Sequence, residues 1–140
     1  MGTYEEILET FKKKLKTVSV VEIADIPKID LYMDQVTTFM DQALTPYKRS
    51  SDGKVLTKTM INNYTKAKVL PPPVKKKYGR MHIMLLIMIF HLKTVLSIKD
   101  IATLFQPIFA LPTKEESEKQ TEKIYAGFIY LQKATLTYMQ

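Results

Sequence analysis

The side chains with the most evident chemistry lie between residues 57 and 80. The polar run TKTMINNYTK is followed shortly by the basic segment VKKKYGR. Asparagine can pair bidentately with adenine, and lysine or arginine on a turn suits phosphate contacts, which fix register without reading sequence. A threonine N-cap at Thr57 would leave backbone N–H groups free to bind a phosphate. The candidate DNA-contacting residues are Thr57, Lys58, Thr59, Asn62, Asn63, Tyr64, Lys66, Lys75, Lys76, Lys77, Tyr78 and Arg80.

Each of these residues also has a purely structural interpretation. Tyr64 shares a helical face with Met60 and Ile61, so it is equally suited to the core. Asn62 and Asn63 fit a solvated helix surface, and the lysines after Val74 fit a solvated turn. The residue types alone therefore do not distinguish DNA contact from a structural role, and what favours DNA contact is the charge distribution and the family resemblance.

The charge distribution favours an acidic partner. The chain has 140 residues and a formal net charge of +7. Residues 48–80 hold ten lysines and arginines and a single acid, Asp52, so the whole excess falls in this window. A basic segment of this kind is typical of nucleic-acid contact, although a solvated basic face has the same composition.

Several classes of site are not expected. The chain has no cysteine, which excludes a disulfide framework, a thiolate zinc site and a cysteine nucleophile. His82 and His91 are nine residues apart, half a turn on a helix, and cannot chelate one metal ion from it. The four glycines are scattered, so no phosphate loop forms, and no nucleophile, base and orienting group can be assembled. We expect no enzyme activity, no metal and no cofactor.

Helical spacing of apolar residues predicts a mostly α fold. The expected helices cover residues 3–16, 30–43, 57–66, 80–94, 97–105 and 113–138, with Tyr32 on the buried face of the second and a linker between Pro107 and Pro112. The fourth is apolar nearly all round and should be central. Its methionines suit either the core or a promiscuous pocket.

Residues 57–105 resemble the DNA-binding half of MerR-type winged helix-turn-helix regulators. Ile61, Tyr64 and the exit Val69-Leu70-Pro71-Pro72 match the family's recognition helix, and Tyr78-Gly79-Arg80 matches its wing. Ser97, Ile98 and Ile101 match the start of a later helix. The chain departs from the family in having Lys68 in place of a helix-ending glycine, Asn63 in place of an aromatic residue, and a longer segment between its second and third helices.

The segments IDLYMDQV, LTKTMINNY and KKYGRMHI are similar to an uncharacterised Gram-positive bacterial family, the YkrK-like proteins, which carry a domain-of-unknown-function label. That likeness covers most of the chain but implies no activity. The MerR resemblance implies a winged helix, double-stranded DNA as partner and a role in transcription regulation.

The resulting expectation is a single mostly α domain over residues 1–140, with a winged helix-turn-helix core at 30–105 and flanking N- and C-terminal helices. The 113–140 helix could form a homodimer through Ile124, Phe128, Leu131, Thr135 and Tyr138, or pack on its own core. No apolar run is long enough to span a membrane, and we expect a cytoplasmic protein. The alternative function is a non-enzymatic interaction module whose basic patch binds an acidic protein, RNA or an anionic membrane surface.

Overall fold

The computed structural model describes residues 3–17, 20–48 and 53–139, and it is mostly helical. Its helices are α1 (Thr3–Thr17), α2 (Met33–Ala43), α3 (Lys58–Lys66), α4 (Arg80–Leu92), α5 (Ile98–Phe109) and α6 (Lys114–Met139). Two short strands, β1 (Leu31–Tyr32) and β2 (Lys77–Tyr78), and two single-turn helices, Ile23–Asp25 and Thr45–Tyr47, complete the described elements. The mostly α prediction is confirmed.

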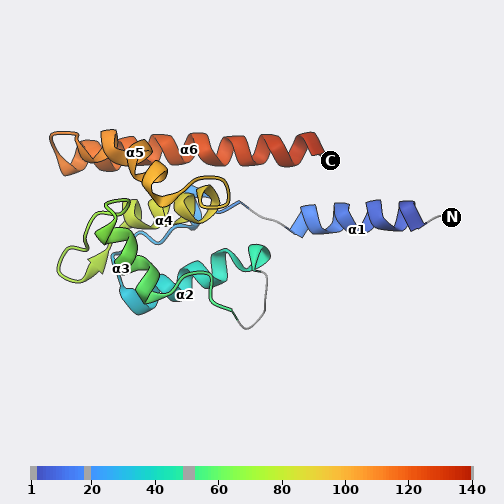
Figure 1. Ribbon diagram of the computed structural model, residues 1–140, viewed down its shortest axis with the longest axis horizontal. Coiled ribbons are helices and arrows are strands. Elements are labelled where there is room, and N and C mark those ends of the chain that lie inside the picture. The colour runs from blue at the N-terminus through green and yellow to red at the C-terminus, as the bar shows by residue number, and fades with distance from the viewer. Residues whose placement is uncertain (1–2, 18–19, 49–52, 140) are drawn as a thin grey trace.

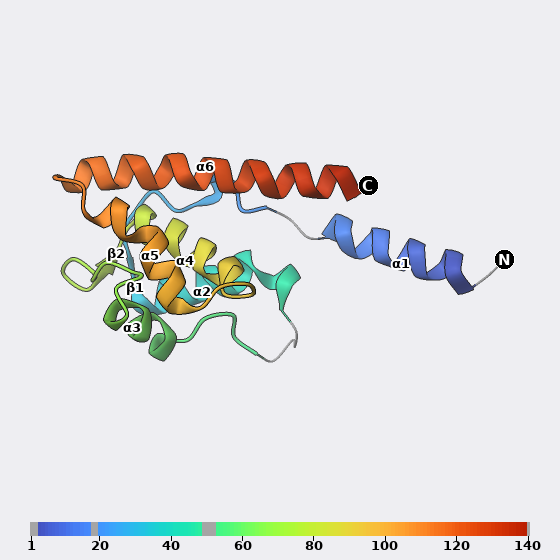
Figure 2. The same ribbon diagram turned by 45° about the horizontal axis from the view of Figure 1, so that its top comes forward.

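The central helix is α4, as its all-round apolar sequence predicts. Every residue from His82 to Ile89 is buried. Helix α6 packs along one side of α4, with α5 beside them, whereas α2 and α3 lie on the opposite side (Figures 1 and 2). Because α4 contacts both layers, it fixes α3 relative to α6.

The segment before β1 is tied to α4 and α6 by side chains from both helices. The hydroxyl of Tyr125 donates a 2.6 Å hydrogen bond to the carbonyl of Val21. Arg80 donates to the carbonyl of Ile26 at 3.0 Å and to that of Ile23 at 3.4 Å. Helix α1 precedes this segment and projects away from the rest of the chain (Figure 2). Its Tyr4, Ile7 and Leu8 are therefore exposed.

The small sheet changes the prediction for the second helix. Strands β1 and β2 pair antiparallel, with Leu31 opposite Tyr78 and Tyr32 opposite Lys77. Helix α2 consequently begins at Met33, and the prediction that Tyr32 lies on its buried face is wrong. Tyr32 is 53% exposed on the strand. Its backbone N–H donates to Oε1 of Gln35 at 2.8 Å, which caps the helix.

Helix α5 runs through Pro107, where the sequence predicts a linker. A proline inside a helix removes one backbone hydrogen bond. Here the burial of Phe105 and Ile108 on the inner face of α5 offsets that loss, since apolar burial stabilises by roughly 1.5–3 kcal/mol for a large side chain. The chain leaves the helix only after Phe109, and Thr113 Oγ1 then accepts from the N–H of Glu116 to start α6.

Part of the proposed dimer seam serves the chain's own core. Ile124 and Phe128 are partly buried against it, while Leu131 and Thr135 are exposed and the side chain of Tyr138 lies outside the described residues. Helices in the described part of the chain include none long and apolar enough to cross a membrane.

Candidate nucleic-acid interface

Helix α3 has one buried face and one free face. Thr57 caps its start, because the Oγ1 atom accepts from the N–H of Met60 at 3.1 Å. Ile61 and Tyr64 are buried and attach the helix to the core. The observed bounds of α3, Lys58–Lys66 after the Thr57 cap, confirm the predicted helix. The face opposite Ile61 and Tyr64 is left to solvent.

The free face carries the predicted polar side chains. Thr59, Asn62, Asn63 and Lys66 are all exposed. Their side chains make no hydrogen bond or ion pair with the residues that the structure describes. Two amides and an ammonium group are thus presented on one surface without internal partners, as a helix that reads base edges would require.

Tyr64 lies in the core, the structural alternative that its position beside Ile61 left open. Its ring is 5% exposed, and its hydroxyl oxygen accepts from Nζ of Lys93 at 3.1 Å. Lys93 is the C-cap residue that directly follows α4. Tyr64 therefore positions α3 against α4, and its hydroxyl is engaged within the chain and not in the predicted phosphate contact.

The C-terminal end of α3 is closed by a lysine in the left-handed region. Lys68 has φ of 62°, and its N–H donates to the carbonyl of Thr65. The N–H of Val69 donates to the carbonyl of Tyr64, which completes a Schellman motif. Glycine is the usual residue at this position because it has no Cβ. The structure thus puts an exposed lysine side chain where backbone geometry favours glycine.

A tight turn carries two more lysines that have positive φ, as Lys68 does. Val74 and Lys77 exchange both backbone hydrogen bonds at 3.0 Å, which leaves a two-residue loop. Its residues Lys75 and Lys76 have φ of 51° and 67°, the conformation of a type I′ turn. Asparagine and glycine dominate such turns. Both lysine side chains are exposed, and the turn lies at the same end of the molecule as α3, far from both termini (Figure 1).

Four other predicted contacts have partners within the chain. Lys58 forms an ion pair with Asp34, whose carboxyl pKa is lowered by this hydrogen bond and charge. Lys77 lies 5.2 Å from the ring centroid of Tyr32. The ring of Tyr78 is buried edge-on against His82, and Arg80 binds the carbonyls before β1. The prediction that Tyr78 and Arg80 contact phosphates is revised, because Tyr78 packs at the base of the turn and the guanidinium of Arg80 is engaged by the segment before β1.

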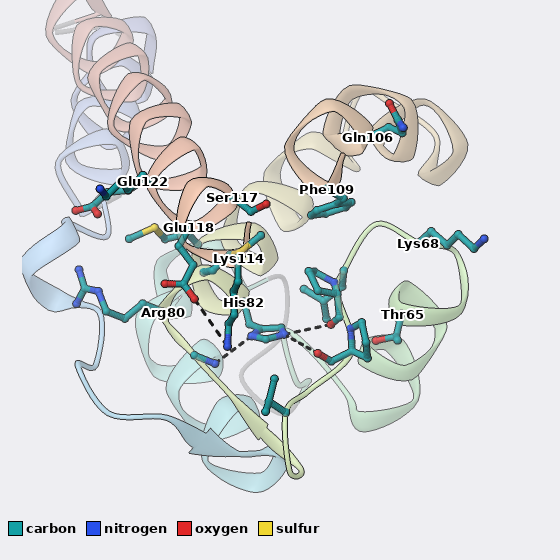
Figure 3. Close-up of a pocket in the computed structure, with 18 of the residues that line it drawn as sticks. Thr65, Lys68, Arg80, His82, Gln106, Phe109, Lys114, Ser117, Glu118 and Glu122 are labelled. Carbon is teal, nitrogen blue, oxygen red and sulfur yellow. Dashed lines mark hydrogen bonds and ion pairs between the residues drawn. The ribbon is translucent and has the colours of Figure 1, made fainter. Parts of the chain in front are cut away.

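His82 connects the turn to the exit of α3 (Figure 3). Its Nδ1 accepts from the N–H of Gly79 at 3.0 Å, so Nε2 carries the proton and faces the carbonyls of Pro71 and Pro72 at 3.2 Å each. Burial lowers the pKa of this imidazole below its ordinary value. The neutral imidazole of His82 therefore joins Gly79, at the end of the 71–79 segment, to Pro71 and Pro72, at its beginning. Among the described residues, no cluster of histidine and acidic side chains could hold a metal ion.

Two residues of this surface were missed by sequence reasoning. The sequence marks Lys68 only as a departure from the glycine of the MerR-type pattern, and no local signal predicts that this lysine adopts a positive φ. The sequence predicts Tyr32 within a helix, because a strand of two residues is too short for an alternating pattern to reveal it.

A family model described as a domain of unknown function, DUF1836, matches residues 21–128. The chain belongs to the DUF1836 family. No curated protein and no solved structure matches it. The DUF1836 match begins after α1, ends within α6 and includes all the interface residues. The predicted domain of unknown function is thereby confirmed, while the YkrK-like name and the MerR likeness stay predictions.

Proposed function

We propose that this DUF1836 protein is a DNA-binding transcription regulator with a winged helix-turn-helix of the MerR type. Helices α2 and α3 would form the helix-turn-helix, and the paired strands with the turn at Lys75 and Lys76 would form the wing. Helix α3 would enter the major groove, and the turn would lie on the phosphate backbone. The core of such a domain would extend from residue 30 to 105.

The observation that carries this proposal is the placement of three lysines at positive φ. In the described part of the chain, the non-glycine residues with positive φ are Lys68, Lys75 and Lys76, and no described glycine has positive φ. The left-handed conformation costs roughly 1–2 kcal/mol for a residue with a Cβ. Glycine would avoid this cost at each site. A strained conformation that persists at three exposed lysines supports a role for their charge outside the fold.

The free face of α3 supports base contact as well as phosphate contact. Asn62 and Asn63 carry amides of the kind that recognise adenine, and Lys66 and Lys68 add exposed ammonium groups at the C-terminal end of the helix. Tyr32 and Lys77 lie opposite one another on the paired strands, where an exposed hydroxyl and an ammonium group could reach the same backbone. The proposed surface thus consists of α3, its exit, the turn and the paired strands β1 and β2.

The salt dependence of duplex binding tests the proposal directly. Random 30-base-pair duplexes selected for retention on the protein supply a cognate site, and fluorescence anisotropy then gives the affinity between 50 and 200 mM salt. Each phosphate contact contributes about 0.9 to the slope of log K against log salt. The double variant Lys75→Ala, Lys76→Ala should lower the slope by about 1.8.

The matched control is the double variant Lys119→Ala, Lys123→Ala on α6, which removes the same charge from exposed positions outside the surface. Its slope should equal that of the wild type. Equal slopes for both variants, or no duplex binding at 50 mM salt, would contradict the proposal. Retained binding to RNA, an acidic protein or anionic vesicles would then favour the interaction module instead.

A further inference from the structure

A large groove separates the proposed DNA-facing elements from α5 and α6. Its volume is about 1350 Å³, and it is lined by the exit of α3, the turn, the start of α4, the outer side of α5 and the start of α6. Figure 3 shows Phe109 on one wall and His82 on the floor, with Lys114 reaching from α6 toward His82. A concavity of this kind is the usual form of a small-molecule site.

The inner surface of the groove is apolar. Leu70 and Met84 are almost fully buried beneath it, and Met81, Ala102 and Phe109 are partly exposed along it. Methionine side chains adapt to irregular apolar shapes. The polar atoms of His82 already have partners in Gly79, Pro71 and Pro72, so the floor offers shape and apolar contact rather than unpaired donors.

The charge around this apolar floor is predominantly positive. Seven cationic and four acidic side chains line the groove. Lys28, Lys68 and Lys99 form no ion pair with described residues, and the pair between Lys114 and Glu118 is long, at 3.9 Å between exposed groups. An organic anion would therefore find apolar contact below and, at the rim, ammonium groups that are unpaired or, at Lys114, held only by a long ion pair.

We infer that this groove binds a small, largely apolar organic anion, such as an aromatic carboxylate. The ring would lie on Met81, Met84 and Phe109, with the carboxylate at the lysine rim beside Lys114. Lys68 and Lys77 line the groove and also belong to the proposed DNA surface. Occupancy would consequently bias the position of the exit of α3 and the turn. That consequence for DNA binding rests on the proposed function, whereas ligand binding itself does not.

The test uses two probes that share a ring and differ in charge, 1-naphthoate and 1-naphthylmethylamine. Titration into protein labelled with ¹³C at the methionine methyl groups reports binding without DNA. Naphthoate should shift the Met81 and Met84 resonances saturably and leave those of Met40 and Met60, outside the groove, in place. The amine should bind about fivefold more weakly, the effect expected of one partly exposed charge interaction.

Matched variants on α5 and α6 localise the site. Thr103→Trp should block the groove and abolish the shifts, while Leu104→Trp, on an exposed neighbour outside the lining, should not. Lys114→Glu should weaken naphthoate binding about fivefold, and Lys123→Glu should not. Circular dichroism melting confirms that each variant is folded.

The outcomes separate the alternatives. Shifts confined to Met81 and Met84 that follow the variants support the inference, whether or not the protein binds DNA. Equal or tighter binding of the amine, shifts at other methionines only, or no saturable shift would overturn it. An acidic peptide that shifts Met81 and Met84 where naphthoate does not would also overturn it, in favour of a protein partner.

Discussion

The ammonium group of Lys93 lies 3.1 Å from the hydroxyl oxygen of Tyr64 and 5.4 Å from the centre of its ring. Lys93 is the C-cap of α4, the central helix, and Tyr64 is on the inner face of α3. The contact therefore sets how the proposed recognition helix sits on the core, and it makes Tyr64 a positioning residue.

Substitution of Tyr64 by phenylalanine should lower the free energy of unfolding by about 1 kcal/mol, because it removes one hydrogen bond and keeps the buried ring. Urea denaturation followed by circular dichroism measures this loss. Tyr130→Phe, at a 70% exposed tyrosine on α6, should leave the midpoint unchanged. A loss of DNA affinity without a loss of stability would instead assign the Tyr64 hydroxyl to the nucleic acid.

Asn62→Ala and Asn63→Ala should each weaken binding to the selected site by roughly 1–3 kcal/mol and affect random duplexes little, since base contacts carry sequence discrimination. Anisotropy on both duplexes gives the two losses. Gln120→Ala, on the exposed start of α6, is the control. An equal loss on both duplexes would mean that α3 does not read bases.

The double variant Lys75→Asn, Lys76→Gly should raise the stability of the protein by roughly 1–2 kcal/mol, because these residues accept the left-handed turn more readily than lysine does. The same variant should bind DNA more weakly. The melting temperature measures the expected gain in stability, and fluorescence anisotropy measures the expected loss of DNA affinity. A stabilised protein with unchanged affinity would show that the lysine side chains have no role in binding.

The stability of the protein should fall as the pH is lowered through the histidine range. Burial lowers the pKa of both His82 and His91, so each ring is neutral in the fold. A depressed pKa in the folded state contributes stability above the unfolded pKa, about 6.5, and this is lost toward the folded pKa. Urea midpoints between pH 7.5 and 5.5 measure the loss.

His91→Gln isolates the contribution of His82 to this pH dependence. Part of the wild-type slope should remain in that variant, and imidazole proton resonances should titrate below pH 6.5 for both rings in the wild type. A midpoint that does not change with pH in His91→Gln would mean that the pKa of His82 is not lowered in the folded protein.

The residues of α3 illustrate what the sequence predicts well. A threonine cap and an inward pair at Ile61 and Tyr64 are local signals, so the start and the buried face of the helix follow from them. The strand at Leu31 and the continuation of α5 through Pro107 depend on partners distant in the chain. No local pattern encodes a lysine at positive φ, because the residue type itself disfavours that conformation.

The hydrogen bond from Tyr125 to Val21 joins residues 104 positions apart. Arg80 of α4 holds the carbonyls of Ile23 and Ile26, but the carbonyl of Val21 acquires its partner only when α6 is present. During synthesis from the N-terminus, residues 20–112 would leave the ribosome before that partner exists. We therefore expect the fold to be completed after α6 emerges, and chains truncated before Tyr125 to be substrates for chaperones and proteases rather than smaller working domains.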